Sequence, residues 1–274
     1  MALSINQNIT AVNAYRNLSN TQNDQAKSLE KLSSGFRINR AADDAAGLAI
    51  SEGLRSQVGG YKVAARNAQD GISVVQTAEG ALTEVHAILQ RVRDLTVQGS
   101  NDSNNAKART NIETEIASLG KELDRITAST NFNGTKLLDG STASLKFQVG
   151  AEGDVDSTIE VTLDNVATTV GGIKDLKVTD NTTAQASIES VDTAIEAVST
   201  TRAGLGAMQN RLEHTIKNVN VAVENLSASE SRIRDTDMAS EMVNFTRTQI
   251  LAQAGTAMLA QAKSIPQGVL SLLQ

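Results

Sequence analysis

The stretch IESVDTAIEAVSTTRAGLGAMQNRLEHTIKNVNVAVENLSASESRI, residues 188–233, decides the fold of this chain. Alternating steps of three and four residues reach Ile188, Val191, Ile195, Val198, Arg202, Leu205, Gln209, Leu212, Ile216, Val219, Val223, Leu226, Glu230 and Ile233. Polar side chains stand at only three of these positions, so the pattern is a sustained heptad seam. It predicts one uninterrupted helix, about 70 Å long, whose apolar stripe packs against other helices.

Two further helical seams can supply those partners. One runs through residues 50–98 and the other through 108–127, with GSNDSNN between them as a turn. The section from Asn39 to Gly47 is small and polar, which predicts an irregular connector before the first seam. Four glycines lie inside that seam: Gly59, Gly60, Gly71 and Gly80. Each costs about 1 kcal/mol against alanine in a helix, so they indicate close approach of neighbouring backbones.

The sequence period changes after Ser129. Leu145, Phe147 and Val149 alternate with polar residues, and Ile159, Val161 and Leu163 do the same. The pattern predicts a hairpin of two short strands, with a third strand at 176–179. The predicted fold is mainly α: an elongated bundle of long helices, with a terminal-helix coiled coil and a small β-hairpin region.

The two ends of the chain share an unusual composition. Lys263 is the only charged residue of 248–274, and Arg16 is the only one of 1–23. The apolar side chains that recur along these ends are Ile5, Ile9 and Val12, and Leu251, Met258, Ile265 and Leu272. Such uncharged amphipathic segments are either frayed tails or terminal helices that become ordered when other protein covers them.

Composition excludes several classes of function. The chain has no cysteine, so disulfides and thiol chemistry are absent, and a pI near 5.1 argues against a nucleic-acid partner. No apolar run is long enough to span a membrane, and residues 1–23 lack the pattern of a signal peptide. This favours either a cytoplasmic protein or export without a cleavable signal.

Residue patterns typical of catalysis or cofactor binding are missing from the sequence. His86 and His214 lie far apart, without neighbouring ligands at metal-binding spacing. Asp154, Asp156 and Glu160 resemble the start of a calcium loop, but Ile159 occupies the position where that loop needs glycine. We therefore expect no enzyme activity, no cofactor and no metal site.

The first half of the sequence contains four long motifs: KLSSGFRINRAADDAAGLAISEGLRSQ (31–57), RNAQDGISVVQTAEGALTEV (66–85), LQRVRDLTVQ (89–98) and FNGTKLLDG (132–140). These motifs resemble bacterial flagellin. In the second half, residues 202–261, from RAGLGAMQNRLEH to TAMLAQ, resemble the C-terminal part of the family. The resemblance covers roughly residues 1–140 and 186–274.

The resemblance implies a structural subunit that polymerises into the flagellar filament, the propeller for swimming motility. It implies that residues 1–42 and 236–274 pair as a coiled coil in an inner tube. Residues 43–235 would then form a helical rod domain, with the β-hairpin region at about 130–184. Only about 45 residues separate Gly140 from Ala186, so the outer domains of larger members are expected to be absent.

The resemblance also implies partners and a location. The subunit would be secreted to the extracellular flagellum by the flagellar type III apparatus, without a cleaved signal peptide. Its partners would be other copies of itself, an export chaperone that covers the C-terminal helix, and the filament cap. Host innate immune receptors read several family members, and the matching positions are Arg91, Leu95, Gln98 and Glu115.

Two other classes share features with this sequence. A hook-filament junction protein of the same export class has terminal helices of this kind, but the long match through both halves favours a filament subunit. A chemoreceptor hairpin would also show extended heptads. It would be expected to carry membrane spans, and uncharged ends would have no explanation.

Overall fold

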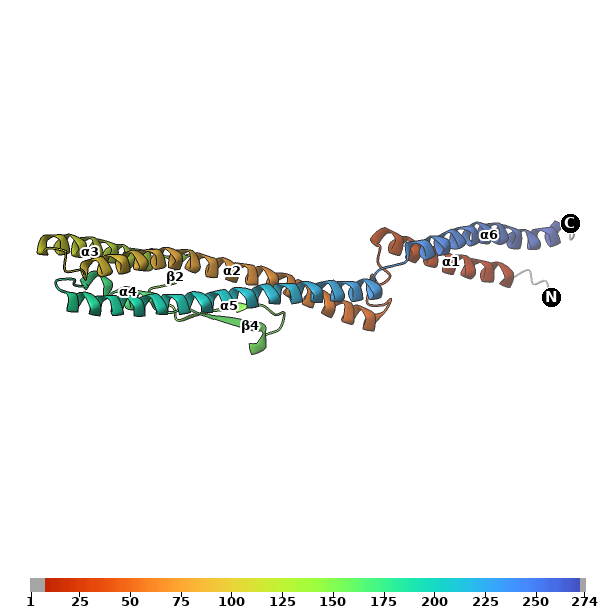
Figure 1. Cartoon of the computed structure of the whole chain (residues 1–274). Coiled ribbons are helices and arrows are strands. Elements are labelled where there is room, and N and C mark those ends of the chain that lie inside the picture. The colour runs from red at the N-terminus through yellow and green to blue at the C-terminus, as the bar shows by residue number, and fades with distance from the viewer. Residues whose placement is uncertain (1–7, 272–274) are drawn as a thin grey trace. The chain divides into compact units, whose positions relative to one another are not determined.

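The computed structural model describes residues 8–271, and the side chains of residues 8–264 (Figure 1). The chain divides into two compact units, one made of residues 1–56 and 225–274 and the other of residues 57–224. The long helices α2 (Ala45–Gly99) and α5 (Asn181–Arg234) each contribute to both units. Within the described residues, no helix combines the length and the apolar character needed to cross a membrane.

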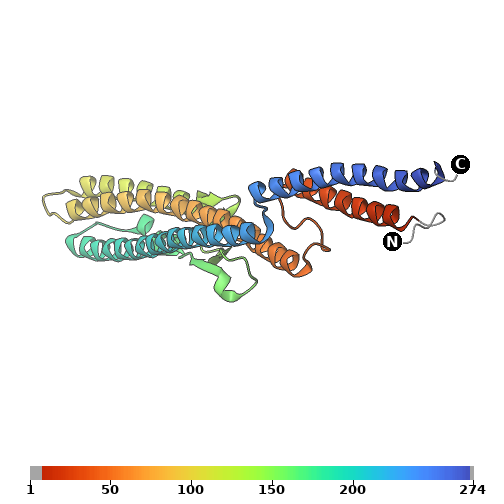
Figure 2. The same cartoon turned by 90° about the vertical axis from the view of Figure 1, so that its right-hand side faces the viewer.

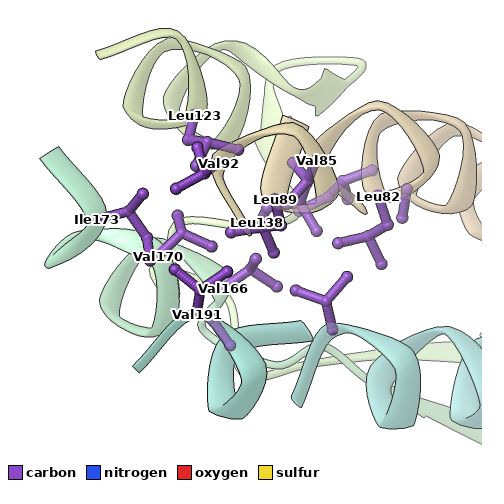
Figure 3. Close-up of a cluster of buried hydrophobic side chains, with 14 of the residues drawn as sticks. Leu82, Val85, Leu89, Val92, Leu123, Leu138, Val166, Val170, Ile173 and Val191 are labelled. Atoms are coloured by element: carbon purple, nitrogen blue, oxygen red, sulfur yellow. The ribbon is translucent and has the colours of Figure 1, made fainter. Parts of the chain in front are cut away.

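In the unit of residues 57–224, α2 and α5 pack with α3 (Ala106–Ser129) around a continuous aliphatic core. Leu82, Val85, Leu89 and Val92 of α2 point into this core toward Val191 of α5 (Figure 3). Leucine, isoleucine, valine and alanine fill it, and the rings of Phe132 and Phe147 pack against it only partly buried, which suits the ridged surfaces of long helices. The predicted helices at 50–98, 108–127 and 188–233 are therefore confirmed.

The observed seam of α5 differs in part from the predicted one. Buried side chains recur every seven residues, at Val191, Val198, Leu205, Leu212 and Val219. The alternate predicted positions, such as Ile188 and Ile195, are only half-buried, and the smaller Ser187 and Ala194 are buried in their place. Small side chains at these positions let α5 approach its neighbours closely.

Two antiparallel hairpins belong to the same unit. Strands β1 (Asn131–Phe132) and β2 (Thr135–Lys136) are joined by Asn133 and Gly134, whose φ angles are 47° and 84°. Positive φ at both central residues defines the tight hairpin turn for which Asn-Gly is favoured. Strands β3 (Ser144–Gln148) and β4 (Thr158–Thr162) pair Leu145 with Val161 and Phe147 with Ile159. This second hairpin confirms the predicted one.

The strand predicted at 176–179 is wrong. Short helices precede this segment, α4 (Val166–Val170) and the 3₁₀ turn η2 (Ile173–Asp175), and residues 176–180 are irregular. The N–H of Val178 donates to Oε1 of Glu113 at 2.9 Å instead of to another strand. The carbonyl of Thr179 accepts from Nη1 of Arg109 at 2.8 Å. Side chains of α3 therefore satisfy the backbone that a strand would have paired.

Charged pairs join the helices of this unit at its surface. Arg93 Nε of α2 donates to Oδ1 of Asp192 of α5 at 2.6 Å, which lowers the pKa of Asp192 and raises that of Arg93. Hydrogen bonds from the N–H and the hydroxyl of Thr183 lower the pKa of Asp180, which precedes α5. Both carboxylates are therefore charged at neutral pH. Asp192 links α5 to α2, and Asp180 binds the first turn of α5.

The prediction that the glycines allow close approach of neighbouring backbones is right at Gly60, while Gly71 meets only side chains, and the prediction is wrong at Gly59 and Gly80. A Cβ on Gly60 would lie 2.9 Å from that of Ala151, and one on Gly71 would lie 3.2 Å from the Phe147 ring. Gly59 and Gly80 have no such neighbour within 4 Å. The close approaches are therefore those of α2 to the β3–β4 hairpin and its loop.

The unit of residues 1–56 and 225–274 contains a connector between its helices. Residues 35–44 join α1 (Ile9–Ser34) to α2. The irregular connector predicted from Asn39 to Gly47 is therefore present, but it begins earlier and ends before Ala45, where α2 starts. The connector is tied to the end of α5, since Arg37 N donates to the Arg234 carbonyl at 2.7 Å and Thr236 N donates to that of Gly35 at 3.0 Å. Arg234 Nη1 also reaches Oε1 of Glu52 at 2.6 Å, and its guanidinium lies over the Phe36 ring.

Gly120 of α3 provides a test of the bundle packing. A Cβ at this position would lie 2.5 Å from the backbone Cα of Lys174, whereas one on Gly204 of α5 meets nothing within 4 Å. Gly120→Ala is expected to lower the free energy of unfolding by about 1–3 kcal/mol, because backbone must move. Gly204→Ala, the matched control, should raise it by about 0.5–1 kcal/mol. Urea unfolding measures both, and equal effects would contradict the packing.

Candidate functional site: the paired terminal helices

Helices α1 and α6 (Met238–Ser271) lie side by side in both views of the structure (Figures 1 and 2). The least exposed positions of α1 are spaced by three and four residues: Ala11, Ala14, Leu18, Thr21, Gln25, Ser28 and Leu32. Those of α6 have the same spacing: Phe245, Thr248, Ala252, Gly255, Leu259 and Ala262. The two lines form the inner seam of the pair, a coiled-coil pattern built mostly from small or polar side chains.

Small residues in the inner seam bring the helices close together. A Cβ on Gly255 would lie 3.2 Å from Cδ1 of Leu18, the most buried leucine of α1. Asn8 caps α1 by accepting from the Ala11 N–H at 3.0 Å, and its Nδ2 donates to the Ala262 carbonyl at 2.7 Å. Asn8 thus both starts α1 and fixes it against α6.

Large apolar side chains lie on the outside of this helix pair. Ile9, Val12 and Met258 are each 66% exposed, and Leu251 is 52% exposed. The other large apolar residues exposed on the two helices are Tyr15, Leu29, Met238, Met242, Val243 and Ile250. Four large apolar residues, Leu18, Leu32, Phe245 and Leu259, lie in the inner seam, but most of those on the two helices lie outside it.

Half of the exposed apolar residues line two depressions: Met242, Val243, Ile250, Leu251 and Met258. The first lies on α6 and is lined by Met242, Val243, Thr246, Arg247, Ile250 and Leu251. The second lies between α6 and α1 and is lined by Thr10, Asn13, Ala14, Asn17, Leu18, Thr21, Leu251, Ala254, Gly255, Met258, Gln261 and Ala262. Leu251 borders both, so we call the two together the outer apolar face.

Charge is distributed unevenly along the pair. A third depression, near the start of α6, is lined by Asp24, Lys27, Ser28, Lys31, Glu241, Asn244, Arg247 and Thr248. Beyond Arg247, the sequence to residue 274 contains one charged side chain, Lys263. Water would solvate the charged end well, whereas the outer apolar face offers little to compensate its contact with solvent.

The seven assembly residues predicted from sequence fall into three groups. Ile9, Val12, Leu251 and Met258 are described and belong to the exposed exterior of the pair. Ile265 lies in α6 but its side chain is not among those described, and Ile5 and Leu272 lie outside the described residues. Their roles in assembly and chaperone binding stay predictions.

Sequence reasoning missed other members of the outer apolar face. Met242, Val243 and Ile250 were not predicted, because a seven-residue interval counted from Leu251 passes over them. The signal that could have found them is the line of small residues through Ala252 and Gly255. Once that line is taken as the inner seam, every large apolar residue off it must face outward.

The second predicted surface involves α2 and α3. Arg91 donates through Nε and Nη2 to Oε1 of Glu115, at 3.2 and 2.7 Å, and both side chains are about half exposed. Gln98 is exposed, but Leu95 is 2% exposed and belongs to the core. Leu95 thus supports α2 from inside, while Arg91, Glu115 and Gln98 can be reached by a partner.

Neither surface gathers ligands for a metal ion. Among residues 8–271, no three histidine or acidic side chains lie close enough together to hold one. His86 is half-buried on α2 with its Nε2 2.9 Å from Nε2 of Gln90, and His214 is exposed on α5. The outer apolar face presents aliphatic and thioether side chains to solvent.

Comparisons with known proteins agree with this arrangement. Residues 5–143 match the family model of the bacterial flagellin N-terminal helical region, and residues 188–273 match that of the C-terminal helical region. The chain is 52% identical over 270 residues to a flagellin of Halalkalibacterium halodurans, covering 98% of this chain and 99% of the relative. It is 50% identical over 306 residues to a Bacillus subtilis flagellin, covering 99% and 100%.

A solved structure extends the similarity to three dimensions. The crystal structure of Bacillus cereus flagellin superposes with a TM-score of 0.50 at 31% identity, covering 60% of this chain and 94% of that chain. Between the two family-model matches lie only residues 144–187, which include the second hairpin and α4. The chain belongs to the bacterial flagellin family, as a short form.

Proposed function

We propose that this chain polymerises with copies of itself into the filament of the bacterial flagellum, and that the outer apolar face is buried between copies. The single observation that carries the proposal is that most of the large apolar residues of α1 and α6 are exposed, while small or polar residues occupy most of the seam between the helices. The role is structural and needs no catalytic site. Identities of 50–52% to flagellins favour a filament subunit over a hook-filament junction protein.

A second copy is the occupant that best fits the outer apolar face. Apart from Arg247, the residues that line the outer apolar face are uncharged, so the uncharged end segments of neighbouring copies can cover the rest of it without burying unpaired charges. Burying the exposed part of Leu251 and Met258 of the outer apolar face, and of Ile9 and Val12 elsewhere on the exterior of the pair, contributes on the order of 1–2 kcal/mol for each side chain. Each subunit of a helical polymer has several neighbours, so these contributions repeat and offset the entropy lost on association.

In the proposed filament, the two predicted domains of the chain occupy different layers. Residues 1–42 and 236–274 would form the inner tube of the filament, and residues 43–235 the rod domain around it. Export through the flagellar type III apparatus, without a cleaved signal, would place the filament outside the cell. The filament cap would receive each subunit there.

Leu251 tests the assembly contact most locally. Leu251→Asn is expected to reduce the rate of seeded filament elongation by about tenfold or more, because a polar group enters an apolar contact. The free energy of unfolding of the monomer should change by less than about 0.5 kcal/mol, since the side chain is exposed there. Light scattering follows elongation and urea unfolding gives the stability.

Leu251→Met is the matched control at the same position. It keeps an apolar side chain of similar volume and should elongate seeds at nearly the rate of the original chain. Normal elongation by Leu251→Asn would show that the outer apolar face is not part of the assembly contact.

The export chaperone gives a second prediction. The outer apolar face needs a cover before polymerisation, and α6 carries most of it. Truncation after Arg247 is therefore expected to abolish binding of the chaperone, while a chain lacking residues 1–23 should retain it. Titration calorimetry measures both affinities, and unchanged affinity after the truncation would place the chaperone elsewhere.

Host innate immune receptors give a third prediction. Arg91, Gln98 and Glu115 occupy an exposed surface of α2 and α3, which neighbouring copies would cover in a filament. Monomers should therefore activate receptor-bearing reporter cells more strongly than the same mass of cross-linked filament. Equal activation by the two forms would show that assembly leaves this surface open.

A further inference from the structure

The methionines of this chain are concentrated on one helix. Three of the five in the sequence, Met238, Met242 and Met258, belong to α6. Their residues are 47%, 51% and 66% exposed, respectively. Methionine is normally a gap-filling residue of cores, so its concentration on an exposed helix surface needs an explanation.

Two of these side chains lie within the outer apolar face. Met242 lines the depression on α6, and Met258 lines the groove between α6 and α1. Met238, at the first position of α6, lines neither. All three methionines are therefore exposed, but only Met242 and Met258 lie in the outer apolar face.

Met208 of α5 shows the contrasting environment. It is half-buried and packs against the core of the unit of residues 57–224. Its sulfur accepts a hydrogen bond from Nη1 of Arg211 at 3.4 Å. An oxidant in solution thus reaches Met242 and Met258 more readily than Met208.

We propose that Met242 and Met258 are modification sites through which a peroxide switches off polymerisation of the free subunit. The proposal rests on the proposed function, because it requires the outer apolar face to be an assembly contact. The reaction needs no group from the protein other than the thioether.

The chemistry of the switch is a two-electron oxidation. The thioether sulfur attacks one oxygen of hydrogen peroxide, an S–O bond forms and the O–O bond breaks, and the second oxygen leaves as water after proton transfer. The sulfur is oxidised to the sulfoxide and the peroxide is reduced. The product is a polar, chiral side chain with a strong hydrogen-bond acceptor.

The consequence follows from where the sulfoxide would be placed. In the free subunit, water solvates the new S=O group, so the fold of the subunit is unaffected. In an assembled contact, aliphatic side chains would surround the group and leave it without a donor, which is unfavourable. Sulfoxide formation therefore weakens assembly selectively, and sulfoxide reductases can reverse it.

The test is seeded elongation of the full chain after peroxide treatment. Mass spectrometry gives the extent of oxidation at each methionine, and far-UV circular dichroism shows that the helices persist. Treated chain is expected to elongate at least about tenfold more slowly than untreated chain, with recovery after methionine sulfoxide reductase. Treated and untreated samples of the double variant Met242→Leu with Met258→Leu should elongate at the same rate as each other, since the variant lacks both thioethers.

Met238→Leu is the matched control, because it removes an exposed thioether that lies outside the outer apolar face. It should remain as sensitive to peroxide as the original chain. Normal elongation by chain oxidised at Met242 and Met258 would overturn the proposal while leaving the assembly contact intact. Equal sensitivity of the double variant would also overturn it. Failure of untreated chain to elongate seeds would instead remove the proposed function on which the switch rests.

Discussion

The structure of the terminal pair depends on the small-residue seam between α1 and α6. Ala14, Ala252 and Gly255 let the two helices pack closely, and Gly255 meets the side chain of Leu18. Because small or polar residues occupy most of the inside of the pair, only a few large apolar residues, such as Leu18, are buried there, and most of the others remain at the surface. A helix pair of this kind buries too little apolar area for strong independent stability. In our account, the missing burial comes from other copies of the chain.

The unit of residues 57–224 uses the opposite arrangement. There the large aliphatic residues of α2, α3 and α5 are inside, and charged pairs such as Arg93 with Asp192 are at the surface. This unit has a continuous core of its own, so its fold does not require polymerisation. One chain thus combines a region that is complete in the monomer with a helix pair whose exterior is suited to contact.

Sequence periodicity predicted the long helices because each seam is satisfied within the chain. The same periodicity could not distinguish inside from outside in α1 and α6, where the larger stripe faces away from the partner helix. The prediction of a strand at residues 176–179 was wrong for another reason. The N–H of Val178 donates to the carboxylate of Glu113, which lies in a distant part of the sequence. Burial of Leu95 was likewise invisible, because a heptad pattern does not say how deep a position lies. The motifs were sufficient to predict the family, whereas the outer apolar face could be identified only from the structure.

Seeded polymerisation with and without the terminal helices tests the central claim most directly. Purified intact chain, and chain trimmed by protease at both ends, are mixed with filament seeds and analysed by sedimentation and negative-stain electron microscopy. Our account predicts that the intact chain forms long uniform filaments, while the trimmed chain stays in the supernatant with its helical core folded. Filament growth by the trimmed chain, or a discrete small oligomer from the intact chain, would contradict it.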